Sequence, residues 1–411
     1  MSETKQPPLS SREPAIALWM STFAFTICFA VWTIFAIIGI RIKEDLGLSE
    51  AQFGLLVGTP ILTGSLVRIV LGVWTTRYGG RLVYTLTMLA AALSTLLLSH
   101  ATTYPQMLLA GLGIGLAGGS FAVGIAYVSP FFPPEKQGTV LGIFGAGNVG
   151  AALTKFVAPF VLVAAGWQMV AQLWAAALIM AAFVFWFTTS DDPAFRSRRD
   201  SKLPQRSLRQ EFAPLKNARV WRFSLYYFFA FGGFVALSLW LPRYLVGVYG
   251  FDIATAGMIA AAYSIPGSIF RAFGGMLSDR KGARSVMYWM FGVSAVATLI
   301  LSLPAGVSPA VFIVVVFVLG FVMSLGKAAV YKHIPVYYPD GVGAVGGVVG
   351  MVGGLGGFVL PIAFGLLKDA TGLWSSCFIL LFAVVAVSLI WMHLSIRQME
   401  RRAPSVSAVA A

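Results

Sequence analysis

The sequence has little charge and very little cysteine. Charged residues make up 11% of its 411 residues, hydrophobic residues make up 58%, and the mean hydropathy is +0.84. A water-soluble core cannot hold that much apolar surface, so the composition predicts a polytopic membrane protein. The only cysteines, Cys28 and Cys377, lie inside apolar runs, which argues against a disulfide or a cysteine–metal framework.

The charge that is present is mostly positive, with a formal net charge of +14. Most of the basic residues fall in short connections between apolar runs, which is typical of cytoplasmic loops rather than of a nucleic-acid-binding surface. The sequence also shows no nucleophile–base pair, metal cluster or cofactor motif. We therefore expect the lipid bilayer as a partner, and we expect no nucleic acid, cofactor, metal site or enzymatic activity.

Twelve apolar segments have the length of about 20 residues that a helix needs to cross a hydrocarbon layer of ~30 Å. Helices are expected because open strands cannot satisfy their backbone hydrogen bonds in lipid. The predicted spans are 16–40, 53–76, 82–100, 105–129, 139–162, 167–189, 221–243, 254–277, 285–303, 308–331, 341–364 and 375–395. The sequence thus predicts an all-α membrane protein with twelve transmembrane helices.

The basic residues also predict the orientation in the membrane. The connection after the sixth span is rich in arginine and lysine, whereas those after the third, fifth and ninth spans contain neither. Even-numbered loops and both termini are therefore expected in the cytoplasm. Arg41 and Lys43 in the first outer loop are contrary signs, which the neighbouring acidic residues Glu44, Asp45 and Glu50 offset.

An internal repeat divides the chain into two halves. Residues 64–81 and 267–284 match at a constant offset of 203 positions, and each copy places an arginine in an apolar run before a glycine-rich basic turn. We predict an N-terminal six-helix half (1–189), a cytoplasmic linker (190–220) and a C-terminal six-helix half (221–411). Two parallel repeats around a central site are typical of transporters.

The turn at 275–284 resembles the loop motif G-x-x-x-D-R-x-G-x-R of the major facilitator superfamily, with Asp279 and Arg280 at its centre. Its twin after the second span keeps Arg77 but has Thr76 in the aspartate position. The resemblance implies the major facilitator fold of two pseudo-symmetric halves, with Arg77, Asp279 and Arg280 in the gate loops. Because one copy lacks the aspartate, we expect the two halves to be latched unequally.

Arg68 and Arg271 are charges inside the predicted membrane spans. Each lies ~12 Å from the cytoplasmic helix end, close to the middle of the bilayer. A cation at that depth costs ~2.5–3.5 kcal/mol on insertion scales and is normally functional. All fifteen acidic residues fall in loops, tails or at span ends. Two arginines without an internal counter-ion predict an anion site, and their planar guanidinium groups suit a planar oxyanion.

Three other basic residues lie in or near the spans. Lys155 is expected to extend its ammonium from a position near a span end to the membrane interface. Lys327 has three open interpretations: a third anion ligand, a titratable coupling group or a structural residue. His333 is a candidate proton carrier, because histidine commonly titrates near neutral pH.

Two corresponding spans, the fifth and the eleventh, are rich in glycine. The glycines to which we assign a role in backbone approach and gating are Gly145, Gly147, Gly150, Gly353, Gly354 and Gly356. Glycine costs about 1 kcal/mol relative to alanine in a soluble helix, so another interaction must offset it. We expect both tight helix packing and close approach of the backbone to a small substrate.

The stretches G-A-G-N-V-G (145–150) and G-G-L-G-G (353–357) resemble the paired signatures of the nitrate/nitrite porter family, and the likeness covers nearly the whole chain. In that family two arginines, from the second and eighth spans, clamp the anion between aromatic rings. Phe144 stands where some members have a second asparagine. The resemblance implies a substrate site formed by Arg68, Arg271, Phe121, Phe231, Tyr227 and Asn148.

We therefore expect a secondary active transporter of nitrate, with nitrite as a second candidate substrate, that works as a monomer in the bacterial inner membrane. Residues 326–335 resemble the branch credited with proton-coupled uptake, which favours nitrate/proton symport with protons as a further partner. The alternatives are a nitrate/nitrite antiporter and an exchanger of organic anions such as oxalate or formate with the same fold.

Overall fold

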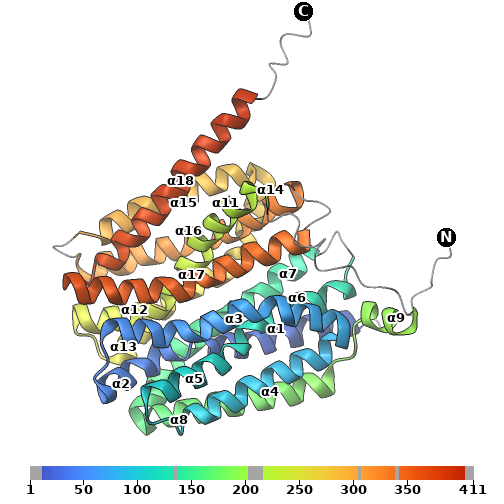
Figure 1. The fold of residues 1–411 in the computed structure, drawn as a ribbon, viewed down its shortest axis with the longest axis horizontal. Helices are drawn as coiled ribbons and strands as arrows, with labels where there is room; N and C mark the ends of the chain where they lie inside the picture. Colours follow the sequence, from blue (N-terminus) through green and yellow to red (C-terminus); the bar gives the residue numbers. More distant parts are fainter. Residues whose placement is uncertain (1–11, 134–136, 202–215, 304–306, 338–341, 403–411) are drawn as a thin grey trace, which may run out of the picture.

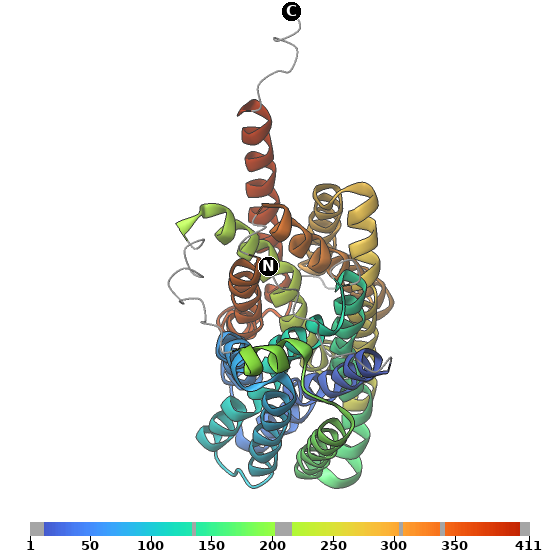
Figure 2. The ribbon, with the colours of Figure 1, turned by 90° about the vertical axis from the view of Figure 1, so that its right-hand side faces the viewer.

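The computed structural model describes residues 12–133, 137–201, 216–303, 307–337 and 342–402, and the regular elements in these ranges are helices. The long helices run along a common direction (Figure 1). The N-terminal helices, blue to green, form the lower part of the molecule, and the C-terminal helices, yellow to red, form the upper part. The view from one end shows the same two groups (Figure 2).

The N-terminal group begins with four long spans and ends in a bent pair. Its helices are α1 (Glu13–Trp32), α2 (Phe35–Leu46), α3 (Glu50–Tyr78), α4 (Gly80–Leu98), α5 (Tyr104–Ile114), α6 (Leu116–Val128), α7 (Gln137–Gly145), the short 3₁₀ segment η3 (Ala146–Val149) and α8 (Gly150–Thr188). A short helix, α9 (Pro193–Ser201), follows in the predicted linker.

The C-terminal group repeats this order. Its helices are α11 (Ala218–Tyr227), the π-helical segment η5 (Phe228–Gly233), α12 (Phe234–Tyr249), α13 (Ile253–Ile269), α14 (Arg271–Lys281), α15 (Ala283–Leu301), α16 (Pro309–Tyr337), α17 (Val342–Thr371) and α18 (Ser376–Arg402).

The number of membrane spans agrees with the prediction once one sharp bend is considered. The described part contains 11 helical stretches that are long and apolar enough to cross a membrane. The longest, Val140–Thr188, has 49 residues, which is about twice the length that one crossing needs. Gly166 interrupts it with φ of 82° and ψ of 167°, a conformation that ends a helix. This stretch is therefore two spans, and the total is twelve.

Several spans are built from two helices with a break between them. The break in the eighth span falls at Phe270, directly before Arg271, and the fifth span narrows into η3, which contains Asn148. The seventh span widens into the π-helical η5, which contains Phe231. Broken helices of this kind line the substrate sites of transporters, because the loosened backbone can face a cavity.

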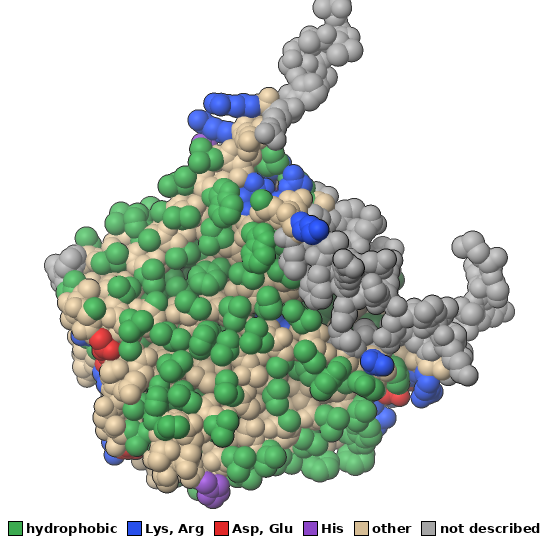
Figure 3. All heavy atoms as spheres, in the orientation of Figure 1, with side chains coloured by type: hydrophobic (Ala, Val, Ile, Leu, Met, Phe, Trp, Pro, Cys, Tyr) green, Lys and Arg blue, Asp and Glu red, His purple; other side chains and the backbone are tan. Residues whose placement is uncertain are grey.

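The bundle has a linker end, where α8 leads to α9, and an opposite far end, where α2 leads to α3 (Figure 1). The face drawn in Figure 3 is largely covered by hydrophobic side chains along the helices, with basic side chains mainly at the top and on the right-hand side. Large apolar side chains such as Phe187 and Trp289 are more than 70% exposed, which fits a surface that faces lipid.

The two halves meet along α3 and α17, whose backbones approach closely from the far end to the middle of the bundle. A Cβ added to Gly58 would lie 2.9 Å from the carbonyl oxygen of Phe358, and a Cβ added to Gly54 would collide with the carbonyl of Pro361. Small residues permit this approach. Nearer the linker end the helices separate, since no heavy atom would lie within 4 Å of a Cβ on Gly72.

Candidate functional site

Arg68 lies in the middle of α3, where the two halves meet. Its side chain is buried, and its Cζ atom lies 5.7, 5.5 and 5.6 Å from the ring centroids of Trp32, Phe121 and Phe231. Its Nη1 atom donates a hydrogen bond of 3.4 Å to the carbonyl oxygen of Gly350 in α17. Phe231 and Gly350 belong to the C-terminal half, so Arg68 contacts both halves.

Arg271 is the first residue of α14, after the break in the eighth span. Its Nη2 atom donates a hydrogen bond of 3.4 Å to the hydroxyl of Tyr227. Its Cζ atom lies 5.7 Å from the ring centroid of Phe121 and 6.0 Å from that of Tyr331. The structure therefore brings both arginines to the same ring, that of Phe121, as the family resemblance implied.

The positive charge of this pair has no partner among the described residues. The ion pairs found in the described ranges all lie elsewhere, and neither Arg68 nor Arg271 takes part in one. Three buried donors lack a hydrogen-bond acceptor: Nε of Arg68, Nη1 of Arg271 and Nδ2 of Asn148. Buried donors are normally satisfied, because leaving one unpaired is costly. An anion bound between the arginines would supply acceptors for the unpaired N–H groups of Arg68 and Arg271.

Aromatic rings form the walls around the arginines. Tyr227 and Phe231 stack with centroids 5.2 Å apart, and Tyr331 meets Tyr227 edge-on at 4.7 Å. On the other side, Phe121 stacks on Phe144 at 5.9 Å. Phe144 thus extends the aromatic wall, with no polar group where some family members have asparagine.

Two predicted glycines lie against the arginines. A Cβ on Gly354 would lie 3.1 Å from Cβ of Ser65 and 3.5 Å from Nη1 of Arg68, while one on Gly145 would lie 3.9 Å from Cδ and Nη1 of Arg271. The backbone is therefore close to both guanidinium groups, and it is tighter around Arg68.

The remaining predicted glycines pack helices together. Gly147 and Gly150 lie against the first span, where an added Cβ would collide with Phe25 and with the carbonyl of Thr26, respectively. Gly353 lies against the ring of Tyr227, and Gly356 lies against Gly232 and Phe228 in η5. The structure therefore shows helix packing at these four glycines, while the predicted approach of the backbone to a substrate stays a prediction.

Lys327 is buried beside the break in the eighth span. Its Nζ atom donates a hydrogen bond of 2.6 Å to the carbonyl oxygen of Gly267 and lies 3.4 Å from the centroid of the Phe234 ring. Gly267 precedes Arg271 by one helical turn. The ammonium is thus bonded to the backbone that leads to Arg271.

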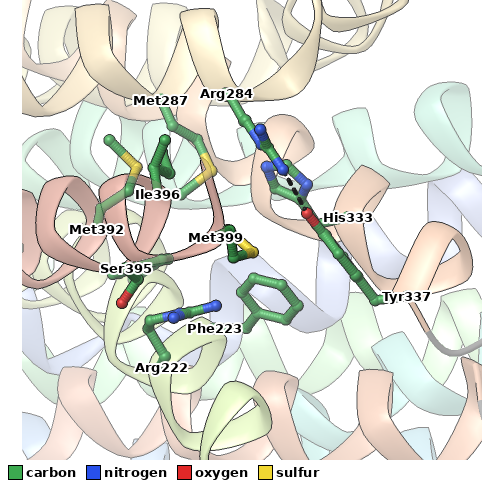
Figure 4. Close-up of a pocket in the computed structure, with 11 residues that line it drawn as sticks. Arg222, Phe223, Arg284, Met287, His333, Tyr337, Met392, Ser395, Ile396 and Met399 are labelled. Atoms are coloured by element: carbon green, nitrogen blue, oxygen red, sulfur yellow. Dashed lines mark hydrogen bonds between the residues drawn. The ribbon is translucent and has the colours of Figure 1, made fainter. Parts of the chain in front are cut away.

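His333 lies in a separate hollow at the linker end. Its ring stacks on Phe223 at 5.6 Å, and the hollow is also lined by Arg222 and Arg284 (Figure 4). Arg284 donates a hydrogen bond of 3.0 Å to the hydroxyl of Tyr337. The structure therefore does not bring His333 to the pair of arginines.

The expectation that Lys155 extends to the membrane interface is wrong. Its side chain has no exposed surface, and its Nζ atom donates hydrogen bonds to Ser238 Oγ at 2.6 Å and to the Ala151 carbonyl at 3.1 Å. The sequence places Lys155 seven residues from a span end, but the packing of the second half over it closes the path to the interface.

A charged cluster joins the halves at the far end. Arg243 of α12 contacts Glu50 of α3 at 2.6 Å, Lys43 lies 3.5 Å from Glu50, and Asp369 accepts hydrogen bonds from the amides of Glu50 and Ala51. These residues were not predicted as gate residues, because the contacts that join the halves pair Glu50 with Arg243 and Asp369, 193 and 319 positions away in the chain.

The predicted gate residues lie at the linker end. Arg77 is exposed, with its Cζ atom 5.9 Å from the ring centroid of Tyr78, and Arg280 is exposed as well. The side chains of Asp279 and Thr76 lie outside the part that the structure describes. The predicted role of Arg77, Asp279 and Arg280 in the gate loops therefore stays a prediction.

Comparisons with known proteins agree with this fold. The family model described as Major Facilitator Superfamily matches residues 20–259 and 249–410. The chain therefore belongs to the Major Facilitator Superfamily. A crystal structure of a bacterial homolog to the human lysosomal transporter Spinster, in an inward-facing and unoccupied conformation, superposes with a TM-score of 0.77 and covers 97% of this chain and 100% of that chain. Its sequence identity is 17%, so it supports the fold alone.

Curated relatives place the chain within the superfamily. It is 43% identical over 409 residues to a probable nitrate/nitrite antiporter, NarK1, of Thermus thermophilus, covering 92% of this chain and 91% of the relative. It is 33% identical to the probable nitrate/nitrite transporter NarK2 of Mycobacterium tuberculosis (87% and 90% covered) and 30% identical to the nitrite extrusion protein of Bacillus subtilis (92% and 94% covered). The predicted resemblance to nitrate/nitrite porters is confirmed.

Proposed function

We propose that this chain transports nitrate, with nitrite as a second substrate, across the bacterial inner membrane by alternating access. The observation that carries this proposal is the pair Arg68 and Arg271 on one Phe121 ring, with buried N–H groups that lack acceptors and no described carboxylate nearby. The names of the relatives support nitrate and nitrite as the anions.

The walls of the site favour a small, planar anion. Guanidinium groups present planar pairs of donors that match planar oxyanions, and aromatic faces accept a flat ion between them. The rings of Phe121, from the N-terminal half, and Phe231, from the C-terminal half, both lie near Arg68, with centroids 5.5 and 5.6 Å from its guanidinium carbon. A larger organic anion would need more polar lining than these rings and glycines offer.

The charge of the two arginines explains how binding of an anion can drive closure. Two guanidinium groups ~8 Å apart repel each other by ~2 kcal/mol at an effective dielectric of ~20. A bound anion removes this repulsion and lets the halves close around it. In the described arrangement the far end is already closed by the α3–α17 contact and by the Glu50–Arg243 ion pair.

Two modes of coupling are compatible with this site, and nitrate/proton symport is the one we favour. Nitrate does not carry a proton at physiological pH, so symport requires a titratable group of the protein. Lys327 is the stronger of the two predicted coupling residues, because it contacts the backbone that carries Arg271, whereas His333 lies in a different hollow. The alternative is nitrate/nitrite exchange, which the poor closure of an unneutralised arginine pair favours.

Counterflow in proteoliposomes tests the proposal. We expect labelled nitrate to accumulate against internal nitrate or nitrite, and we expect oxalate and formate to support little or no accumulation. Transport of oxalate with no response to nitrate would contradict the proposed substrate. A pH gradient imposed on the same vesicles separates the two modes, since only symport predicts net nitrate uptake driven by external acid.

The orientation also belongs to this proposal. We infer that the linker end, with both termini, lies in the cytoplasm, that the far end faces outward and that the protein works as a monomer. A cysteine at the exposed far-end position Thr102 should react with a membrane-impermeant thiol reagent added to intact cells. Reaction only after the cells are opened would contradict this orientation.

A further inference from the structure

Lys155 forms a polar contact between the two halves that the proposed transport site does not use. The residue belongs to α8 of the N-terminal half, and its side chain has no exposed surface. Its Nζ atom donates to the Ser238 hydroxyl at 2.6 Å, and Ser238 belongs to α12 of the C-terminal half. A lysine ammonium buried between two domains is therefore bonded across their interface.

The contact continues as a chain of hydrogen bonds into the C-terminal half. The hydroxyls of Ser238 and Ser264 lie 3.0 Å apart, and Ser264 donates to the carbonyl of Ala260 at 3.1 Å. If Ser238 donates to Ser264, each hydroxyl accepts one bond and donates one. No ion pair in the described ranges involves Lys155, so neutral oxygens alone hold its ammonium.

The polar bridge, which is the chain of hydrogen bonds from Lys155 through Ser238 to Ser264, lies nearer the far end than the arginine pair does. Gly145 of the same span lies against Arg271, and Lys155 follows it by ten residues, which is ~15 Å along the span toward the far end. The backbones of α8 and α13 are close at this level, because a Cβ on Gly257 would collide with the carbonyl oxygen of Lys155. The bridge thus belongs to a second contact between the halves, in addition to the α3–α17 contact.

We propose that Lys155 is a positioning residue of the transport cycle, which holds the far end closed through its bond to Ser238. The proposal rests on alternating access by the proposed transporter. When the far end opens, α8 separates from α12 and α13, and the bond between Lys155 and Ser238 must break. Hydrogen bonds to charged groups are among the stronger ones in proteins, and in a dry interface no water replaces the lost partner until the halves have parted.

Distance measurements between the halves test this proposal. Spin labels at the exposed far-end positions Thr102 and Ser308 report the separation of the two halves there. In detergent without nitrate, the labels should show one population of molecules with a short separation and one with a long separation. We expect Lys155→Met and Ser238→Ala each to raise the ratio of the long-distance population to the short-distance population by about tenfold. Ser294→Ala is the matched control. Ser294 is a buried serine of the C-terminal half whose hydroxyl has no hydrogen-bond partner among the described residues. This substitution should leave the ratio unchanged.

The double variant shows whether the two substitutions act through the same Lys155–Ser238 hydrogen bond or independently of each other. Because both substitutions remove the same interaction, Lys155→Met combined with Ser238→Ala should shift the ratio no further than the larger single change. Unchanged distances in Ser238→Ala, in a protein that remains monodisperse on size exclusion, would overturn the proposal even where Lys155→Met fails to fold. Fully additive shifts would overturn it as well. These outcomes do not depend on nitrate, so they are separate from failure of the proposed substrate.

Discussion

The two halves use the same repeated motif to place an arginine, but they support that arginine differently. Arg68 lies within the continuous α3, and its guanidinium group reaches the carbonyl of Gly350 in the other half. Arg271 starts α14 after a break, and its hydrogen bond goes to Tyr227 in its own half. The comparison suggests that Arg68 responds to the relative position of the halves, whereas Arg271 is held by local structure.

The two halves also differ in the hydrogen-bond donor near each arginine. In the N-terminal half Trp32 lies against Gly64, one turn before Arg68, and its indole N–H donates to the Pro60 carbonyl, a further turn back, at 2.8 Å. In the C-terminal half Phe234 lies against Gly267, one turn before Arg271, but has no N–H to donate, and Lys327 donates to the Gly267 carbonyl. The donor beside Arg271 is therefore charged, whereas the donor beside Arg68 is a neutral indole.

Loss of either guanidinium group should have the largest effect on transport. Arg68→Lys and Arg271→Lys keep the charge but remove the planar donor pair, so we expect nitrate counterflow to fall about 100-fold in each, which corresponds to ~3 kcal/mol. Arg41→Lys is the control, because Arg41 is an exposed arginine at the far end. Retained transport in both clamp variants would contradict bidentate binding.

A pair of glycine substitutions compares how much free space lies beside each arginine. Gly354→Ala places a methyl group 3.1 Å from Cβ of Ser65 and 3.5 Å from Nη1 of Arg68, whereas Gly145→Ala leaves 3.9 Å to Arg271. We expect nitrate affinity to fall at least tenfold in Gly354→Ala and to stay within about twofold in Gly145→Ala, because overpacking costs about 1–3 kcal/mol. Binding measured by displacement of labelled nitrate checks both. Equal losses would show that the two sides are equally tight.

Lys327→Met tests whether the charged donor to the Gly267 carbonyl supports Arg271. Removal of the ammonium leaves the Gly267 carbonyl without its donor and loosens the backbone before Arg271, so we expect nitrate affinity to fall about tenfold. The measurement is the concentration dependence of counterflow, together with uptake driven by a pH gradient. If counterflow persists while acid-driven uptake disappears, Lys327 also serves the coupling. Unchanged affinity and unchanged coupling would leave it only a structural role.

Hydropathy and the repeat were sufficient to predict the fold. The spans, the offset of 203 residues and the arginines follow from local composition, and the break at Gly166 only separates two predicted spans that run together as one helical stretch. The pairing of Arg68 with Arg271 was also predictable, since their equal depth places them at the same level of the membrane.

The supporting contacts were not predictable from composition. Lys155 looks like a residue near a span end until Ser238, 83 positions away, closes over it. Trp32 and Tyr331 were missed because aromatic residues form 14% of the chain, so a single ring carries little information. The helix break at Phe270 has no proline at the break itself and depends on its tertiary surroundings, including Lys327.

Tyr227→Phe should have the smallest effect, and it isolates the local support of Arg271. The substitution keeps the ring that stacks on Phe231 but removes the hydroxyl that accepts from Nη2 of Arg271 at 3.4 Å. A hydrogen bond of this length contributes about 1 kcal/mol, so nitrate affinity should fall about fivefold, with the maximal rate preserved. Arg68 should be unaffected, so combination with Gly354→Ala should give additive losses. A loss that disappears in the Gly354→Ala background would mean that the two arginines act as one coupled unit, and the contrast between the halves would then be wrong.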